Sequence, residues 1–390
     1  MHVDLNAFYA TAEQLRCPDY QGKPVIVGGL GRRGVVSTCS YEARSFGVHS
    51  AMPIGEAKRL CPNGIYLSCD FPYYEMLSRS FFGYLKKFSS LVEAASIDEG
   101  FVDMTKYLQN NKNVPETLKN IQDGLYKELG LKCSIGVGPT KFLAKMASDM
   151  KKPMGITIIR KRDIKAKLYS LPIDNFFGVG KKTTPYLKSL GINTIGEFAN
   201  ALESDETGMR KRFGKAYDYY LSSIHGEGDD TVIVEYPDQK SINHSSTFPN
   251  DTNDQEEIRL MIERLSSHVA AGLVREKKKC KTVSVNIKDE NFKVSSKSMT
   301  LEESTNDYEE LSRIAWSIFS KAYTGIVIRL VGVSASNLVP LKEKNIQMSF
   351  WNYEKYEKED ETQLLVSSLN RKANKKILMM ASEVKKNGNK

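Results

Sequence analysis

Asp98 and Glu99, two neighbouring carboxylates between apolar runs, constrain the fold of this chain more than any other feature of its sequence. Leu91-Val92 before them and Phe101-Val102 after them are typical of β-strands, which predicts a hairpin with the acidic pair at or near its turn. Asp4 adds a third carboxylate within another apolar run. Negative charges at a buried sheet edge are costly unless a cation neutralises them. A solvated turn is the plainer alternative for the acidic pair taken alone.

These carboxylates predict a divalent metal site for phosphoryl transfer. Carboxylate oxygens are the ligands that Mg²⁺ prefers, and Mg²⁺ keeps positions open for water and substrate phosphates. Asp4, Asp98 and Glu99 are enough to bridge two such ions about 3.5 to 4 Å apart. One ion would then activate an attacking hydroxyl while the other holds the leaving phosphates.

The length and charge of the chain set broad limits on its organisation and partners. With 390 residues it is expected to divide into roughly two to four domains. Its formal net charge of +9 suits a polyanionic partner. The six cysteines have no C-x-x-C spacing and the five histidines no H-E-x-x-H spacing, which argues against a zinc site. No leader precedes Asp4 and no apolar run approaches the roughly 20 residues that span a bilayer, so we expect a reduced, cytoplasmic protein.

The order of elements predicts an α+β protein of several domains. Alternating strand and helix patterns up to Pro153 favour a sheet with helices on one face. From residue 240 to 340 the predicted order is β-α-β-β-α-β, a compact unit.

Between these parts, the turn Gly178-Val179-Gly180-Lys181-Lys182 and the helix after it are typical of a helix-hairpin-helix. Backbone N–H groups in such a turn can hold a DNA phosphate without reading bases. A plain helical turn with a glycine cap is the alternative.

Several residues are candidates for binding a triphosphate. The spacing of Thr38, Tyr41 and Arg44 predicts a hydroxyl, a phenol and a guanidinium projecting along one helical entry. A capped amphipathic helix with a surface arginine is the alternative. Lys152 follows a helix in which Lys145 and Asp149 are four residues apart, and it either contacts phosphate or favours the helix dipole.

Two aromatic features remain open between function and packing. Phe8-Tyr9 follows Asp4 closely enough for an aromatic ring to lie beneath a nucleotide sugar and exclude a 2′-hydroxyl, although core packing suits Phe8. In the polar C-terminal tail, the apolar island from Gln347 to Phe350 and Trp351 favours docking to a partner over packing on its own domain.

These motifs together resemble the Y-family of translesion DNA polymerases, and the resemblance extends over essentially the whole chain. The segments that carry it are residues 3–10, 36–53, 95–103, 134–153 and 177–183. It implies a right-hand polymerase with a palm (1–10 and 70–160), small fingers (11–69), a helical thumb with the helix-hairpin-helix (161–226), a linker (227–239), a little finger (240–340) and a flexible tail (341–390). The sequence departs from many relatives at Asn6 and Gly100, neither of which is expected to ligate metal.

The resemblance also implies roles for individual residues. Asp4, Asp98 and Glu99 would bind two Mg²⁺ ions with help from the Leu5 carbonyl. The incoming nucleotide would be held by Phe8, Tyr9, Thr38, Tyr41, Arg44 and Lys152, with Tyr9 as the steric gate against ribonucleotides. The thumb would contact DNA through Gly178, Gly180, Lys181 and Lys182. The tail would bind a sliding clamp through Gln347, Phe350 and Trp351, although its Phe-Trp ending departs from the commoner Leu-Phe.

The function expected from these features is template-directed DNA synthesis. The enzyme would add dNTPs to a primer 3′-hydroxyl by two-metal phosphoryl transfer and copy damaged templates with low fidelity. We expect it to act as a monomer on primer-template DNA, with no membrane partner. Two other classes remain open: a non-catalytic DNA-binding scaffold, which an intact carboxylate trio disfavours, and another palm enzyme such as a nucleotidyl cyclase, which should not need a helix-hairpin-helix.

Overall fold

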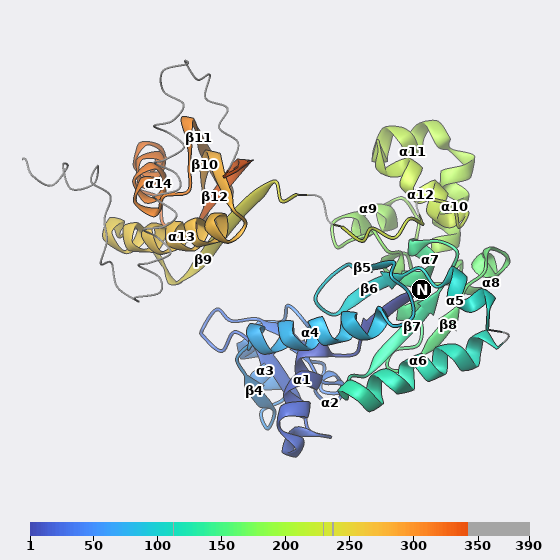
Figure 1. The fold of residues 1–390 in the computed structure, drawn as a ribbon. Coiled ribbons are helices and arrows are strands. Elements are labelled where there is room, and N and C mark those ends of the chain that lie inside the picture. Colours follow the sequence, from blue (N-terminus) through green and yellow to red (C-terminus); the bar gives the residue numbers. More distant parts are fainter. Residues whose placement is uncertain (112, 229, 236–237, 342–390) are drawn as a thin grey trace, which may run out of the picture. The chain divides into compact units, whose positions relative to one another are not determined.

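A computed structural model describes residues 1–341 apart from 112, 229 and 236–237 (Figure 1). The chain divides into two compact units, Met1–Asp238 and Gln239–Lys390. The predicted clamp segment, with Gln347, Phe350 and Trp351, lies outside the described residues.

The first unit is built on a five-stranded sheet in the order β5-β6-β1-β7-β8. Neighbouring strands run antiparallel except for β7 and β8, which are parallel. The predicted hairpin around the acidic pair is confirmed, because β5 and β6 pair and Glu99 is the first residue of β6. The strands are β1 (His2–Leu5), β5 (Val92–Ala94), β6 (Glu99–Val102), β7 (Cys133–Val137) and β8 (Ile156–Ile158).

Helices cover both faces of this sheet, so the prediction of helices on one face is wrong. Val3 and Leu5 pack with apolar residues of α4 and α6, whereas the alternate residues of β1 meet α7 on the other face. Sequence periodicity identifies the two faces of a strand but not what covers each of them. The helices in this part of the unit are α4 (Phe71–Leu85), α5 (Thr105–Gln109), α6 (Val114–Leu129) and α7 (Lys141–Asp149).

Close packing of α7 on the sheet depends on Gly136. A Cβ at this position would lie 2.0 Å from the Ala144 carbonyl oxygen and 2.3 Å from the Ser148 backbone nitrogen. The helix backbone therefore rests directly on β7, and this contact fixes the height of α7 above the sheet. Thr140 caps the start of α7, since its side chain accepts a hydrogen bond from the Leu143 N–H.

A second, three-stranded sheet in the order β3-β2-β4 has its own small apolar core. Its strands are β2 (Val25–Gly28), β3 (Val36–Cys39) and β4 (Ile65–Leu67), and the neighbouring helices are α1 (Phe8–Arg16), α2 (Tyr41–Arg44) and α3 (Ile54–Leu60).

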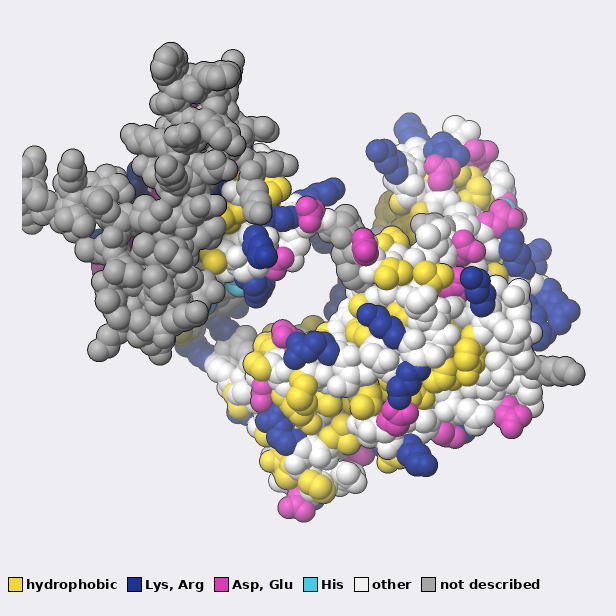
Figure 2. Space-filling view, in the orientation of Figure 1, with side chains coloured by type: hydrophobic (Ala, Val, Ile, Leu, Met, Phe, Trp, Pro, Cys, Tyr) yellow, Lys and Arg dark blue, Asp and Glu magenta, His cyan; other side chains and the backbone are white. Residues whose placement is uncertain are grey.

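The rest of the first unit is helical, and the apolar side of α7 packs into its core. Basic side chains gather on it around α11, as Figure 2 shows. Its helices are α8 (Ile164–Leu168), α9 (Thr183–Ser189), α10 (Ile195–Ser204), α11 (Glu206–Phe213) and α12 (Ala216–Ile224).

The second unit has the predicted β-α-β-β-α-β order. Its antiparallel sheet has the strand order β11-β10-β12-β9 and shares one apolar core with both helices. The elements are β9 (Ser241–Thr252), α13 (Gln255–Arg275), β10 (Lys278–Asp289), β11 (Val294–Thr305), α14 (Tyr308–Ala322) and β12 (Ile328–Pro340). In the described part of the chain, no helix combines the length and hydrophobicity needed to span a membrane.

Candidate active site

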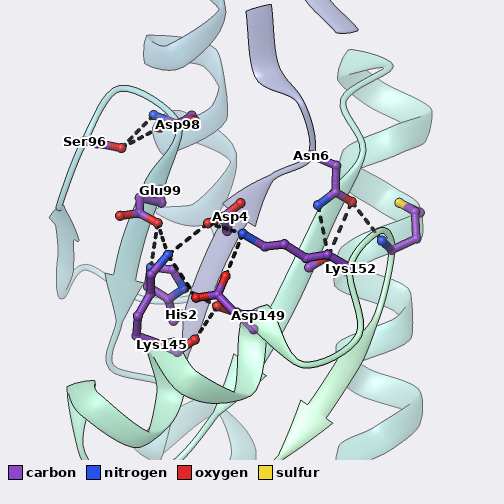
Figure 3. A network of polar contacts seen from close by, with 12 residues as sticks. His2, Asp4, Asn6, Ser96, Asp98, Glu99, Lys145, Asp149 and Lys152 are labelled. Carbon is purple, nitrogen blue, oxygen red and sulfur yellow. Dashed lines mark hydrogen bonds and ion pairs between the residues drawn. The ribbon is translucent and has the colours of Figure 1, made fainter. Parts of the chain in front are cut away.

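Two of the three predicted metal ligands face each other across neighbouring strands. Asp4 on β1 pairs in register with Glu99 on β6, so both side chains lie on the sheet face that α7 covers (Figure 3). Like charges directly opposite each other destabilise a sheet. Lys145 of α7 offsets this repulsion, because its Nζ lies 3.1 Å from Asp4 Oδ2 and also contacts Glu99 Oε2.

A second ammonium reaches the same carboxylate from the loop after α7. Lys152 Nζ lies 2.7 Å from Asp4 Oδ2 and 2.7 Å from Asp149 Oδ1. Burial alone would raise the pKa of Asp4, but a hydrogen bond shared with Glu99 and the charges of the two lysines lower it. Burial and the hydrogen bond with Asp4 raise the pKa of Glu99. Asp4 is therefore the stronger acid of the two, and the ammonium groups of both lysines contact its Oδ2.

The third carboxylate, Asp98, points away from this pair. Its Oδ1 accepts a hydrogen bond of 2.6 Å from the Ser96 hydroxyl within the hairpin turn, as Figure 3 shows. Asp98 lies in the turn before β6, which begins at Glu99, and the two neighbouring carboxylates point to different sides (Figure 3). Within residues 1–341, apart from the undescribed positions, no three His, Cys, Asp or Glu side chains surround a common metal position.

The donors present nevertheless fit a hard divalent cation. Carboxylate oxygens are the preferred ligands of such ions, and the two lysines on Asp4 mark the place where the fold requires positive charge. Asp98 lines the same cavity as Asp4, so the hairpin turn brings it to the site from another side.

That cavity, of about 320 Å³, collects the predicted nucleotide residues. Of the residues predicted to hold metal or nucleotide, all except Glu99 line it: Asp4, Leu5, Phe8, Tyr9, Thr38, Tyr41, Arg44, Asp98 and Lys152. Glu99 instead contacts Lys145.

The spacing of the phosphate-binding candidates predicted that they project together from the start of one helix, and this prediction is wrong. Thr38 belongs to strand β3, and α2 begins only at Tyr41, with Ser40 as its N-cap. Arg44 ends this short helix, and its guanidinium lies over the Tyr41 ring at 4.6 Å from the ring centroid. The spacing alone misses the boundary that Ser40 makes: this helix-capping residue separates the strand from the helix.

The predicted steric gate, Tyr9, rests on a second aromatic ring. Tyr9 and Tyr74 stack with ring centroids 4.3 Å apart and planes 12° from parallel. The Tyr74 hydroxyl donates a hydrogen bond of 2.7 Å to Glu13 Oε1, which holds the lower ring in place. Phe8 is 2% exposed and belongs to the core of the unit, in agreement with the packing alternative, although it also reaches the cavity wall.

Sequence reasoning missed the supporting residues of this site. Along the buried strand β1 and the residue that follows it, His2, Asp4 and Asn6 alternate with apolar residues, a period-two pattern that could have revealed a polar face. Asn6 Oδ1 accepts a hydrogen bond of 2.8 Å from the Met154 N–H and so holds the loop that carries Lys152.

His2 supports the other end of the same face. Its Nδ1 lies 2.8 Å from the Ser148 hydroxyl on α7, and its Nε2 lies 3.6 Å from Glu99 Oε2. Burial lowers the pKa of His2 to about 3, so the ring is neutral.

The predicted DNA-contacting turn lies immediately before α9. Gly178, Gly180, Lys181 and Lys182 are all exposed. The Gly180 carbonyl accepts hydrogen bonds from the N–H groups of Thr183 and Thr184, which starts the helix. The two lysine side chains are therefore presented at the surface of the helical segment.

Comparison with known proteins agrees with this architecture. The impB/mucB/samB family model matches residues 3–149, its C-terminal domain model matches residues 239–350, and the IMS family HHH motif matches residues 161–192. The chain is 38% identical to DNA polymerase IV 1 of Bacillus subtilis (strain 168), over 99% of this chain and 93% of the relative. It is 36% identical to DNA polymerase IV of Listeria monocytogenes (strain EGD-e), over 89% of this chain and 97% of the relative.

Solved structures give the same result. A Y-family DNA polymerase chimera, Dbh-Dpo4(243-245)-Dbh, is similar with a TM-score of 0.76 and 27% identity, over 87% of this chain and 98% of that one. An insertion ternary complex of Dbh DNA polymerase has a TM-score of 0.58 and 27% identity over the same shares. Fold and site together define a DNA-directed DNA polymerase. The chain belongs to the impB/mucB/samB family, the Y-family polymerases of translesion synthesis.

Proposed function

We propose that Asp4, Asp98 and Glu99 hold two Mg²⁺ ions with which this enzyme adds dNTPs to a primer 3′-hydroxyl. A dependence on divalent metal follows from the family. The support for Asp4 and Asp98 is the single cavity that they and Leu5 share with the nucleotide candidates, and the support for Glu99 is its register pairing with Asp4. Mg²⁺ bound there would activate the hydroxyl and neutralise charge on the leaving pyrophosphate.

Different side chains around the cavity bind different parts of the nucleotide. Arg44 and Lys152 bring positive charge to the triphosphate, and Thr38 and Tyr41 offer hydroxyl donors. These contacts align the reacting phosphorus with the primer, which is the main contribution a protein makes to phosphoryl transfer. Tyr9, backed by Tyr74, excludes the 2′-hydroxyl of ribonucleotides.

The other expected partners are proposals of the same kind. Primer-template DNA is held in part by the turn Gly178 to Lys182, and the segment Gln347 to Trp351 docks on a sliding clamp. We expect a cytoplasmic monomer, with palm, fingers, thumb and little finger divided as the sequence motifs indicate.

Primer extension with matched carboxamide variants tests the metal assignment. Asp98→Asn removes a charge that faces the cavity, and Asp103→Asn makes the same change five residues on, where the side chain accepts from the Thr105 N–H. We expect Asp98→Asn to lose extension by at least about a thousandfold while its DNA affinity stays near that of the unaltered protein. Asp103→Asn should extend normally. Normal extension by Asp98→Asn would remove Asp98 from the site.

Primer extension separates the enzyme from a scaffold, and a gel shift separates it from a cyclase. A non-catalytic scaffold would bind primer-template without extending it, with or without Mg²⁺. A nucleotidyl cyclase would fail to shift primer-template in a gel.

A further inference from the structure

Lys145 and Lys152 both contact Asp4 Oδ2, but they approach it from different sides. Lys152 lines the nucleotide cavity, whereas Lys145 does not. Lys145 comes from the helix packed on the sheet, its side chain is 12% exposed, and it also contacts Glu99. The two lysines therefore have different tasks, and only Lys152 is placed to meet a triphosphate directly.

The position of Lys145 is held firmly by its surroundings. The backbone of α7 rests on Gly136, where a Cβ would clash with the Ala144 carbonyl. The Ser148 hydroxyl donates a hydrogen bond of 2.8 Å to the Lys145 carbonyl and also meets His2 of β1. The Lys145 ammonium therefore lies between β1 and β6 on a helix whose distance from the sheet is fixed by close packing.

The pairing of β1 with β6 creates the need for this charge. Asp4 and Glu99 are in register on neighbouring strands and share a face that α7 covers. Two carboxylates so close together repel each other, and the repulsion grows as water is removed. An ammonium in contact with one oxygen of each carboxylate offsets that repulsion.

We propose that Lys145 is a positioning residue that occupies, between Asp4 and Glu99, the place of a metal ion when none is bound. The role of the two carboxylates as metal ligands rests on the proposed function. Lys145 keeps the ligand pair assembled in the metal-free enzyme and, because like charges repel, weakens the binding of the first cation. A triphosphate adds negative charge to the site, so metal and nucleotide should bind more tightly together than either does alone.

Metal binding and thermal unfolding of the full chain, without DNA or nucleotide, test this role. Mn²⁺ is the probe, with free ion measured by electron paramagnetic resonance. We expect Lys145→Met to bind Mn²⁺ at least about tenfold more tightly, because a neighbouring positive charge is gone. Without metal, its Tm should fall by about 5 °C or more. Adding Mn²⁺ should raise the Tm of Lys145→Met by more than it raises the Tm of the unaltered protein.

Lys141→Met is the matched control. Lys141 lies one turn earlier on α7 and pairs with a single sheet carboxylate, Glu93, at 2.6 Å, with a side chain that is also largely buried. It should lower the Tm without changing Mn²⁺ affinity. Lys145→Arg, which keeps the charge, should bind Mn²⁺ within about threefold of the unaltered protein.

An Mn²⁺ affinity of Lys145→Met that is unchanged or weaker overturns the proposal, whatever happens to the Tm. Should that variant not fold, Lys145→Gln takes its place, and failure of Mn²⁺ to restore folding to either variant also overturns it. Primer extension by the unaltered protein keeps the proposed function separate. If the unaltered protein extends primers normally but Lys145→Met binds Mn²⁺ as the unaltered protein does, only the role of Lys145 is refuted. If the unaltered protein does not extend primers but Lys145→Met shows the expected change in Mn²⁺ affinity, only the polymerase site is refuted.

Discussion

Replacing Gly136 with alanine is expected to damage the active site without touching any residue that lines it. Gly136 pairs with His2 across β7 and β1, and an added Cβ would lie 2.0 Å from the Ala144 carbonyl oxygen. An ordinary contact of this kind is at least 3.4 Å, and the opposing atoms belong to backbone. Helix α7 must therefore move away from the sheet by more than an ångström.

The size of the effect follows from what α7 carries. Forced overpacking of this kind typically costs about 1 to 3 kcal/mol of unfolding free energy. The displacement also withdraws Lys145 from Asp4 and Glu99 and moves the loop that carries Lys152. A shift of about 1 Å in positioning groups is enough to lower turnover about a hundredfold.

Urea unfolding and single-nucleotide primer extension measure the two effects on the same preparation. Gly83→Ala is the control, because Gly83 lies within α4 and an added Cβ there would have nothing within 4 Å. Alanine there should stabilise the helix by about 0.5 to 1 kcal/mol and leave extension unchanged. A Gly136→Ala protein that unfolds and extends primers like the unaltered one would refute the close packing of α7 as the support of the site.

Three further predictions concern other parts of the first unit. Tyr9→Ala should raise the ratio of ribonucleotide to deoxynucleotide kcat/KM by at least about tenfold, and an unchanged ratio would exclude the gate role. Replacing Lys181 and Lys182 together with alanine should weaken DNA binding and reduce the slope of log affinity against log salt by about 2; an unchanged slope would place the DNA elsewhere. Burial raises the pKa of Tyr84 to about 12 from its ordinary 10.0. Between pH 10.0 and about 12 the folded protein therefore keeps a proton that the unfolded chain releases, so the free energy of unfolding should fall as the pH rises through this range. Tyr84→Phe should make that fall shallower. An equally steep fall in that variant would contradict the burial argument.

The parts of the fold that depend on local pattern could be predicted from the sequence. The acidic hairpin and the β-α-β-β-α-β order of the second unit both follow from runs of strand and helix periodicity. The residues of the nucleotide cavity were found through short motifs whose residue types suit phosphate and metal. Local chemistry is enough for such predictions because the residues of each motif are close together in the chain, even where a strand ends and a helix begins between Thr38 and Arg44.

Contacts between distant elements could not be predicted in the same way. The register that sets Asp4 opposite Glu99 depends on the pairing of strands almost a hundred residues apart. The side that Asp98 faces depends on where the turn ends, a matter of one residue, because a slip by one moves a side chain to the other face. The role of Lys145 could not be predicted either, because nothing local in the sequence indicates that α7 covers the acidic face. The only local signal at this lysine is its helical spacing from Asp149.

The two faces of β1 explain why stability and chemistry are coupled in this protein. Val3 and Leu5 supply buried apolar area on one face, and Asp4 carries the charge on the other. Burying that charge is tolerated only because α7 brings cations to it, and α7 is held there by its own apolar side in the helical core. A change in that core therefore reaches the carboxylates through the helix. The active site depends on how three layers pack, as well as on the residues that line its cavity.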